Sequence, residues 1–348
     1  MNTIIEDMRS GVDEEGIVRA GDILKHGGLV AFPTETVYGL GADALDAQAA
    51  ARIYAAKGRP SDNPLIVHIA DWDALDYIVE EIPEEARLLA DAFWPGPLTM
   101  IFKKSEVVPL ATTGGLQTVA VRMPVNEVAR AMIRAGGGYI AAPSANTSGR
   151  PSPTKASHVM DDMDGIIEMI IDGGDVEIGL ESTIVDLTED TPMILRPGYI
   201  NEEMLEKVVG SVKIDPAVSG ADTKARPKAP GMRYRHYAPR ADLIIVEGAQ
   251  EAVREKINEL VQEAAACGKV PGIIGTDESR DLYQGGLVKS IGSRADELTI
   301  AQHLYSILRE FDDSDISVIY SESFETPNMG LAIMNRLIKA AGHQIIKV

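Results

Sequence analysis

The spacing of short apolar runs changes along this chain, and the change predicts its architecture. Up to about residue 209, the runs are bounded by Gly, Pro and Asn, as strands are, and only some are separated by helical patterns. After residue 240, strand and helix patterns alternate. Strict alternation favours a parallel sheet covered by helices. We therefore predict an α/β protein in which residues 1–209 form an α/β domain with a twisted mixed sheet and residues 241–348 form a smaller Rossmann-like domain.

The individual elements are predicted from the same patterns. In the first region, strands are expected at GLVAFP (28–33), PLIVHIA (64–70), LTMIFK (98–103), TVAVRMP (118–124), YIAAPSA (139–145) and STIVDL (182–187), with helices near 46–57, 83–93, 125–135 and 154–162. In the second region, strands are expected at 241–248, 269–275 and 315–322, with helices near 249–266, 296–310 and 331–341. Residues 210–240 contain four prolines, many charges and no sustained periodicity, so we predict a linker.

The charge of the chain argues against general nucleic-acid binding. The formal net charge is −20, and residues 1–209 hold 16 Lys and Arg against 34 Asp and Glu, a net charge of −18. Most nucleic-acid affinity comes from neutralising phosphates, so we expect no direct stable binding of nucleic acid. Residues 224–240 are an exception, with six bases and no acid. This basic linker segment is either a lid drawn over the acidic domain or a spacer.

The composition also limits the compartment and the metal chemistry. Cys267 is the single cysteine, which excludes a disulfide framework and a cysteine-based zinc site. The first ten residues carry acids where a signal peptide carries bases, and no apolar run approaches the length of a membrane span. We expect a cytoplasmic protein that does not bind membranes.

The stretch KGRPSDNPL (57–65) places Lys57 and Arg59 on a turn between a helical pattern and a buried strand. Ordering such a turn costs conformational entropy, which suggests that the two cations hold an anion. Other bases in Gly-, Pro- or Ser-rich turns at strand ends are Arg122, Arg150, Lys155 and Arg196. Each base alone is better explained as a solvated loop residue. Together, in an acidic domain, they indicate a positive pocket for a small anion.

Residues 141–154, AAPSANTSGRPSPT, concentrate hydroxyls, amides and small side chains. Small residues let backbone N–H groups approach an anion, and Ser and Thr add donors. Alternatively, Ser152 or Thr154 caps the following helix, and a capped helix N-terminus can itself attract anions. His68, within LIVHIA, is either a satisfied core residue or a ligand contact. Trp94 is more typical of packing than of stacking.

Common nucleotide and metal motifs are almost absent. Neither GxxxxGK[ST] nor HExxH occurs in the chain. The string GLGADA (39–44) satisfies G-x-G-x-x-A, and Asp62 follows at about the right distance. Because no βαβ unit clearly surrounds it, it is a weak candidate for a dinucleotide site.

Several motifs closely resemble the YrdC family in their order and spacing, over essentially the whole chain. They are FPTETVYGLG (32–41), KGRPSDNPL (57–65), FWPGPLT (93–99), VAVRMP (119–124), APSANTSGRPSPT (142–154) and ESTIVDL (181–187), with RYRHYAP (233–239) and NMGLAIMNRLIKAA (328–341) resembling the long form of the family. The resemblance implies an L-threonylcarbamoyladenylate synthase, a nucleotidyltransferase. Such enzymes make threonylcarbamoyl-AMP and pyrophosphate from L-threonine, bicarbonate or CO2, and ATP.

The resemblance also implies partners and site residues. The product feeds N6-threonylcarbamoyladenosine at tRNA position 37 through a separate tRNA threonylcarbamoyl-transferase complex, and Mg²⁺ is expected with ATP. Lys57 and Arg59 are implied as catalytic phosphate ligands. The further implied ATP contacts are Asn63, Thr118, Ser144, Asn146, Ser152, Arg196 and Tyr234, and the implied threonine contacts are Thr36, His68, Arg122, Ala142 and Ser182.

Two alternatives compete with this interpretation. A non-catalytic RNA-binding or ribosome-maturation factor could use the basic linker as its contact, although the overall charge argues against it. A hydrogenase-maturation carbamoyltransferase also contains a YrdC-like unit, but it is expected to carry a zinc-finger segment, which the single Cys267 excludes.

Overall fold

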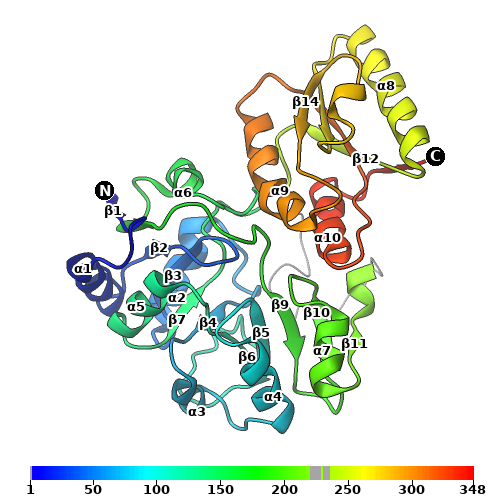
Figure 1. The fold of residues 1–348 in the computed structure, drawn as a ribbon. Helices are drawn as coiled ribbons and strands as arrows, with labels where there is room; N and C mark the ends of the chain where they lie inside the picture. The colour runs from blue at the N-terminus through cyan, green and yellow to red at the C-terminus, as the bar shows by residue number, and fades with distance from the viewer. Residues whose placement is uncertain (1, 220–228, 230–235) are drawn as a thin grey trace. The chain divides into compact units, whose positions relative to one another are not determined.

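The computed structural model describes residues 2–219, 229 and 236–348, and their packing divides the chain into two compact units (Figure 1). The first unit comprises Met1–Ser148, Ser152–Glu177 and Glu181–Arg233, and the second comprises Gly149–Pro151, Ile178–Leu180 and Tyr234–Val348. Each unit is built on one sheet. Among the described residues, no helix has the length and apolar character needed to cross a membrane.

The described residues of the first unit form one 11-stranded mixed sheet, as predicted. In spatial order its strands are β1 (Ile4–Asp7), β8 (Met169–Asp172), β2 (Val30–Phe32), β3 (Gly39–Asp43), β7 (Ile140–Ala142), β4 (Ile66–His68), β6 (Thr118–Arg122), β5 (Leu98–Lys103), β9 (Thr183–Asp186), β10 (Met193–Arg196) and β11 (Lys213–Ile214). Parallel pairs such as β4 with β6 occur beside antiparallel pairs such as β5 with β6. This mixture explains why strands and helices do not alternate in the sequence.

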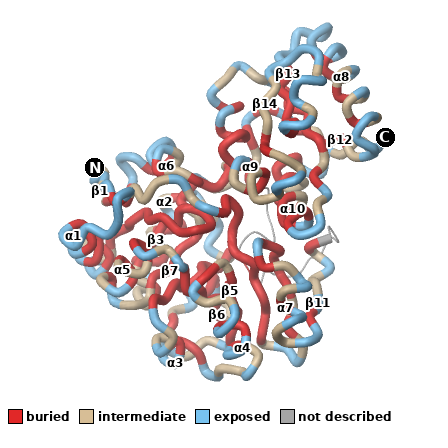
Figure 2. The backbone as a smooth tube through the Cα atoms, in the orientation of Figure 1, coloured by how far each residue is buried: buried red, intermediate tan, exposed pale blue. Residues whose placement is uncertain are grey.

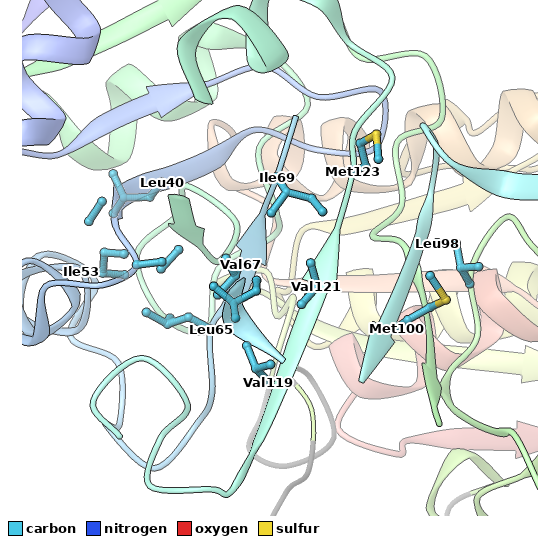
Figure 3. Close-up of a cluster of buried hydrophobic side chains, with 14 of the residues drawn as sticks. Leu40, Ile53, Leu65, Val67, Ile69, Leu98, Met100, Val119, Val121 and Met123 are labelled. Atoms are coloured by element: carbon cyan, nitrogen blue, oxygen red, sulfur yellow. The ribbon is translucent and has the colours of Figure 1, made fainter. Parts of the chain in front are cut away.

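Helices cover one face of this sheet along most of its width. The helices of the first unit are α1 (Glu14–Lys25), α2 (Ala47–Lys57), α3 (Leu75–Ile78), α4 (Glu84–Phe93), α5 (Glu127–Ala135), α6 (Ala156–Met163) and α7 (Glu202–Val209), with short 3-10 helices at Trp72–Ala74 and Pro216–Ser219. The main core joins α2, α4, α6 and α7 to alternate strand residues such as Val67, Val121 and Met100 (Figure 3). Figure 2 shows these strands as buried.

The opposite face of the sheet is covered differently. Helices α1 and α5 pack against β2, β7 and β8 at one side of it. Further along the sheet, the buried apolar cluster consists of strand residues and one linker residue: Ile66, Ile101, Ala120, Ile184, Leu195 and Ala229. Within the described part of the chain, no helix contributes to that cluster. This helix-free stretch carries the polar row described below.

The string GLGADA lies within strand β3 rather than at a turn between a strand and a helix. Its glycines serve close packing, because a Cβ added at Gly41 would lie 2.9 Å from Ile140 and 3.2 Å from the carbonyl oxygen of Val30. A dinucleotide fingerprint needs a strand-to-helix turn, so this candidate is wrong.

The second unit has a five-stranded parallel sheet, in agreement with the predicted Rossmann-like domain. Its strand order is β14 (Leu287–Ser290), β13 (Pro271–Gly275), β15 (Val318–Glu322), β12 (Asp242–Glu247) and β16 (Ile345–Lys347). Its helices are α8 (Gln250–Ala266), α9 (Glu297–Asp312) and α10 (Gly330–Ala340), with a 3-10 turn at Arg280–Leu282. Val253, Ile257 and Val261 of α8 pack against this sheet. β15 is inserted between β13 and β12, where a dinucleotide-binding Rossmann sheet has these two adjacent.

Candidate active site

Polar side chains form one row across the helix-free part of the first sheet. His68 of β4 is the register partner of Arg122 of β6, and Arg122 is the partner of Thr99 of β5. Thr99 pairs with Ile184 of β9, which lies opposite Arg196 of β10. Register partners project from the same face of a sheet. Two predicted threonine contacts and one predicted ATP contact therefore share this face.

A β-bulge directs Arg196 into this row. The pairing of β10 with β9 shifts between Ile194 and Arg196, as happens when one extra residue is inserted into a strand. Arg196 Nε donates to the carbonyl oxygen of Ser182 at 3.0 Å, and its Nη2 donates to Ser182 Oγ at 3.1 Å. Ser182 Oγ lies 2.7 Å from Thr99 Oγ1. Ser182 thus joins Arg196 to Thr99. Thr99 was not among the site residues predicted from the sequence.

The loop between β2 and β3 brings two further side chains to Arg122. Arg122 Nη1 donates to Thr36 Oγ1 at 2.8 Å, and Nε donates to the carbonyl oxygen of Gly96 at 3.3 Å. Arg122 Nη2 lies 2.7 Å from Glu35 Oε1, in an ion pair with almost no exposure to solvent. The pair lacks hydrogen-bond geometry, and both carboxylate oxygens of Glu35 are buried without a hydrogen-bond partner. Glu35 was also missed, although it lies within the FPTETVYGLG motif.

His68 is buried and neutral in this environment. Burial, and then the positive charge of Arg122, lowers the pKa of His68 from 6.5 to about 3. Its Nδ1 lies 3.1 Å from the carbonyl oxygen of Ile66, and its ring packs edge-on against Phe32 with centroids 5.8 Å apart. A neutral imidazole can offer one donor and one acceptor. His68 is therefore a satisfied sheet residue that also lies beside Arg122, so the two readings of the sequence are compatible.

Lys57 is the centre of a second group of polar residues. It ends α2, and Gly58 follows in the left-handed conformation with φ 62°, which frees the chain to turn. Lys57 is 2% exposed, and its ammonium donates to the carbonyl oxygen of Ser144 at 2.6 Å and to that of Asn146. Ser144 Oγ donates to Asn146 Oδ1 at 2.6 Å. Three of the predicted ATP contacts are therefore in direct contact with one another.

The rest of the cationic turn lies beside this group. Arg59 Nη2 donates to the carbonyl oxygen of Pro64 at 3.2 Å, so the guanidinium braces its own turn. Asn63 is 2% exposed, and its Oδ1 has no hydrogen-bond partner. Thr118 begins β6 and projects from the same face as Arg122, about 13 Å away along the strand. A buried, unpartnered oxygen at Asn63 marks a position where a ligand could donate a hydrogen bond.

Backbone hydrogen bonds hold the motif loops together. Tyr38 N donates to the carbonyl oxygen of Pro153 at 2.9 Å, and Ala145 N donates to that of Tyr38 at 2.8 Å. Ser148 N donates to the carbonyl oxygen of Lys57 at 2.9 Å. The loops after β2, α2 and β7 therefore adjoin one another. Ala142 ends β7 opposite Ile66, on the face that carries His68.

Ser152 does not cap a helix, contrary to one of the alternatives above. Helix α6 begins after Lys155 and has no side-chain cap, so the predicted cap at Ser152 or Thr154 is wrong. Instead, Ser152 is fully buried and its Oγ donates to Glu181 Oε1 at 2.6 Å. This bond ties the loop after β7 to the residue before Ser182.

Two of the bases grouped by the sequence lie in other settings. Arg150 belongs to the second unit, where it forms an ion pair with Asp312 at 3.8 Å. Lys155 pairs with Asp175 at 3.2 Å. Trp94 donates from Nε1 to the carbonyl oxygen of Leu98 at 2.7 Å, in keeping with packing. Tyr234 lies outside the described residues.

Comparison with known proteins identifies the family. Residues 22–198 match the Sua5–YciO–YrdC family model, described as "Telomere recombination". Residues 200–342 match a model described as "Threonylcarbamoyl-AMP synthase, C-terminal domain". The chain belongs to the Sua5–YciO–YrdC family. The resemblance to YrdC proteins of the long form is thereby confirmed.

Two relatives that match this Sua5–YciO–YrdC protein over nearly its full length share one name. A threonylcarbamoyl-AMP synthase of Pyrococcus abyssi is 52% identical over 346 residues, covering 99% of this chain and 100% of the relative. The protein of that name from Bacillus subtilis is 49% identical, covering 95% of this chain and 94% of the relative. A crystal structure described as P. abyssi Sua5 complexed with L-threonine has a TM-score of 0.95 at 51% identity and covers 99% of this chain and 100% of that one.

Proposed function

We propose that this protein synthesises threonylcarbamoyl-AMP and pyrophosphate from L-threonine, bicarbonate or CO2, and ATP, as a nucleotidyltransferase of tRNA modification. The observation that carries the proposal is the presence of two buried polar groups, one around Arg122 and one around Lys57, joined by hydrogen bonds between the loops after β2, α2 and β7. The match to synthases of that name over nearly the full chain supports it. The product then passes to a separate tRNA threonylcarbamoyl-transferase complex.

The Lys57 group is proposed to hold ATP. Lys57 and Arg59 bind phosphate oxygens, and Asn63, Thr118, Ser144, Asn146 and Ser152 position the nucleotide. Arg196, from the polar row that also carries Arg122, is proposed as a further ATP contact. Lysine acts as a compact point charge and arginine as a planar fork, and both suit phosphate. Because Lys57 bonds the carbonyl oxygens of Ser144 and Asn146, the same side chain would hold the loop after β7 and contact ATP.

The Arg122 group is proposed to hold L-threonine. Arg122 binds the carboxylate, and Thr36, His68, Ser182 and the backbone of Ala142 line the remainder of the amino-acid site. The hydroxyls of Thr36 and Ser182 offer partners to the side-chain hydroxyl of threonine. A site built to bond a hydroxyl rejects analogues that lack it, so serine should compete better than valine.

The reaction needs little covalent participation by the protein. The amine of threonine takes up CO2 to give a carbamate, a carbamate oxygen forms a bond to the α-phosphorus of ATP, and the bond to pyrophosphate breaks. Catalysis then consists of positioning the partners and stabilising the charge that develops on the phosphates. Both the carbamate and the mixed anhydride, threonylcarbamoyl-AMP, are sensitive to water, which favours closure of the site. The proposed lid at 224–240 falls largely outside the described residues. Between residues 220 and 235 the structure describes Ala229 alone, and Ala229 is buried on the site face of the sheet.

Magnesium is proposed to enter as part of the ATP substrate. Across the described ranges, no group of three or more His, Cys, Asp or Glu side chains could hold a metal ion. Mg²⁺ in phosphate-transfer sites is usually held by substrate phosphates and water with few protein ligands. The ion would neutralise charge on the phosphates beside Lys57 and Arg59. A cytoplasmic location, expected from the sequence, stays a prediction.

The proposal is tested by measuring pyrophosphate release from ATP with threonine and bicarbonate each omitted in turn. The expected result is release that requires both, with threonylcarbamoyl-AMP identified by its mass. No release in any combination, from a protein that still binds ATP, would refute the synthase function. A strongly salt-dependent affinity for RNA would then favour the RNA-binding alternative.

A further inference from the structure

Glu35 is a buried acid that none of the roles above explains. Its side chain is 3% exposed in the ion pair with Arg122, and neither carboxylate oxygen has a hydrogen-bond partner. A carboxylate taken out of water loses its hydration, and an ion pair offsets that loss only when the remaining lone pairs are also satisfied. The unpartnered oxygens therefore mark a position that lacks donors in this structure.

The neighbours of Glu35 identify the kind of donor that is missing. Within the described residues, Glu35 is the single acid within 4 Å of Arg122. Thr36 Oγ1 accepts from Arg122, and Thr34 donates to the carbonyl oxygen of Val37 at 2.6 Å, so neither hydroxyl is directed at the carboxylate. Arg122 Nη2, like the two oxygens, lacks a hydrogen-bond partner. The site thus presents a cation and an anion side by side, and both have hydrogen-bonding atoms without a partner.

A zwitterion complements this arrangement. An α-amino acid carries a carboxylate and an ammonium on one carbon atom, and its three N–H donors match the acceptor-only oxygens of Glu35. When such a ligand enters, the internal ion pair is exchanged for two ion pairs with the ligand, and no net charge is buried. A hydroxy acid has the carboxylate but lacks the ammonium, so it leaves Glu35 unsatisfied.

We propose that Glu35 binds the α-ammonium group of the amino-acid substrate while Arg122 binds its carboxylate. This inference rests on the proposed function, which supplies L-threonine as the substrate, and it deepens that function by naming the residue that distinguishes amino acids from hydroxy acids. The alternative is a purely structural role, in which Glu35 only neutralises the charge of Arg122 in the buried site.

The test compares two ligands and two substitutions of Glu35. The ligands are L-threonine and its analogue (2S,3R)-2,3-dihydroxybutanoate, in which a hydroxyl replaces the α-amino group. Glu35→Gln removes the charge with little change of shape, and Glu35→Asp keeps the charge beside Arg122 but retracts it by one methylene. Glu168→Gln is the control, since Glu168 pairs with Arg52 at 2.6 Å away from the site. Affinities come from calorimetry and from competition against product formation, with thermal unfolding as the check on folding.

The proposal predicts that substitution of Glu35 lowers the affinity for threonine and not the affinity for the hydroxy-acid analogue. Glu35→Gln should weaken threonine binding roughly 10- to 100-fold, the size expected for one charged hydrogen bond, without weakening the analogue. Glu35→Asp should weaken threonine binding by a smaller factor, and Glu168→Gln should leave both ligands unchanged. The proposal is overturned if Glu35→Asp binds threonine as tightly as the wild type, or if Glu35→Gln changes both ligands by the same factor. A wild-type protein that forms no product from threonine would instead refute the proposed function.

Discussion

Replacing Arg122 by Met should destabilise the first unit more than replacing Arg122 and Glu35 together. The two side chains are 4% and 3% exposed and lie 2.7 Å apart, so removing the cation alone leaves Glu35 as an uncompensated buried charge. Breaking a buried pair in this way typically destabilises a protein by about 3–5 kcal/mol. The substitution also removes the bonds to Thr36 and to the carbonyl oxygen of Gly96.

The other variants of this double-mutant cycle are expected to lose less stability than Arg122→Met. Glu35→Gln should cost about 1–3 kcal/mol, because Arg122 keeps its bonds to Thr36 and Gly96. Arg122→Met combined with Glu35→Gln removes both charges, so the double variant should be more stable than Arg122→Met alone. Coupling between contacting residues is usually about 0.5–3 kcal/mol, and a value near the upper end is expected for a pair this close.

Tryptophan fluorescence makes the measurement specific to the first unit. The chain has two tryptophans, Trp72 and Trp94, and both lie in that unit. Urea titrations followed by fluorescence therefore report its unfolding without a signal from the second unit. A double variant that is no more stable than Arg122→Met would refute the reasoning, because it would mean that the charge of Glu35 is compensated by some other group.

Three further predictions follow from individual contacts. His68 stays neutral when folded and takes up a proton below pH 6.5 when unfolded, so the wild type should lose about 1.5 kcal/mol more than His68→Asn between pH 6.5 and 5; equal losses in urea titrations would contradict this. Gly41→Ala should destabilise the first unit by about 1–3 kcal/mol, because its Cβ would lie 2.9 Å from Ile140, and an unchanged urea midpoint would show that β3 and β7 separate freely. Lys57→Met should lower kcat/KM for ATP at least ~100-fold in the pyrophosphate assay. The control is Lys155→Met, which removes a surface ion pair. A smaller loss of kcat/KM for Lys57→Met than for Lys155→Met would exclude Lys57 as a phosphate ligand.

Strongly patterned elements were predictable from the sequence. The helix expected at 46–57 is α2, the helix expected at 249–266 is α8, and the strand expected within PLIVHIA is β4. Their apolar periodicity and their Gly or Pro boundaries are local properties, which a single sequence carries. Strand β3 was not predicted, because its glycines weaken the strand pattern and are required only by neighbours on β2 and β7.

The site was predictable in its parts and not in its connections. Lys57, Ser144 and Asn146 were each named from motifs, but the hydrogen bonds from Lys57 to the other two residues span 87 and 89 positions of the sequence. Glu35 and Thr99 were missed because a lone acid in a motif and a Thr in a strand carry no local signal. Their importance arises from register and burial, which are set by the pairing of distant strands.

The cations of this site are already compensated before any ligand binds. Lys57 donates to backbone carbonyl oxygens, Arg196 to the carbonyl oxygen and hydroxyl of Ser182, and Arg122 faces Glu35. Because the three side chains are buried, leaving their charges without partners would cost several kcal/mol each. Ligand anions must therefore share or replace these internal partners rather than fill an empty positive site. The oxygens that accept from Lys57, on Ser144 and Asn146, carry no formal charge, whereas the carboxylate of Glu35 competes directly with a ligand carboxylate for Arg122. Binding at Arg122 thus requires a ligand that compensates Glu35 in exchange, which an amino acid does through its own ammonium group.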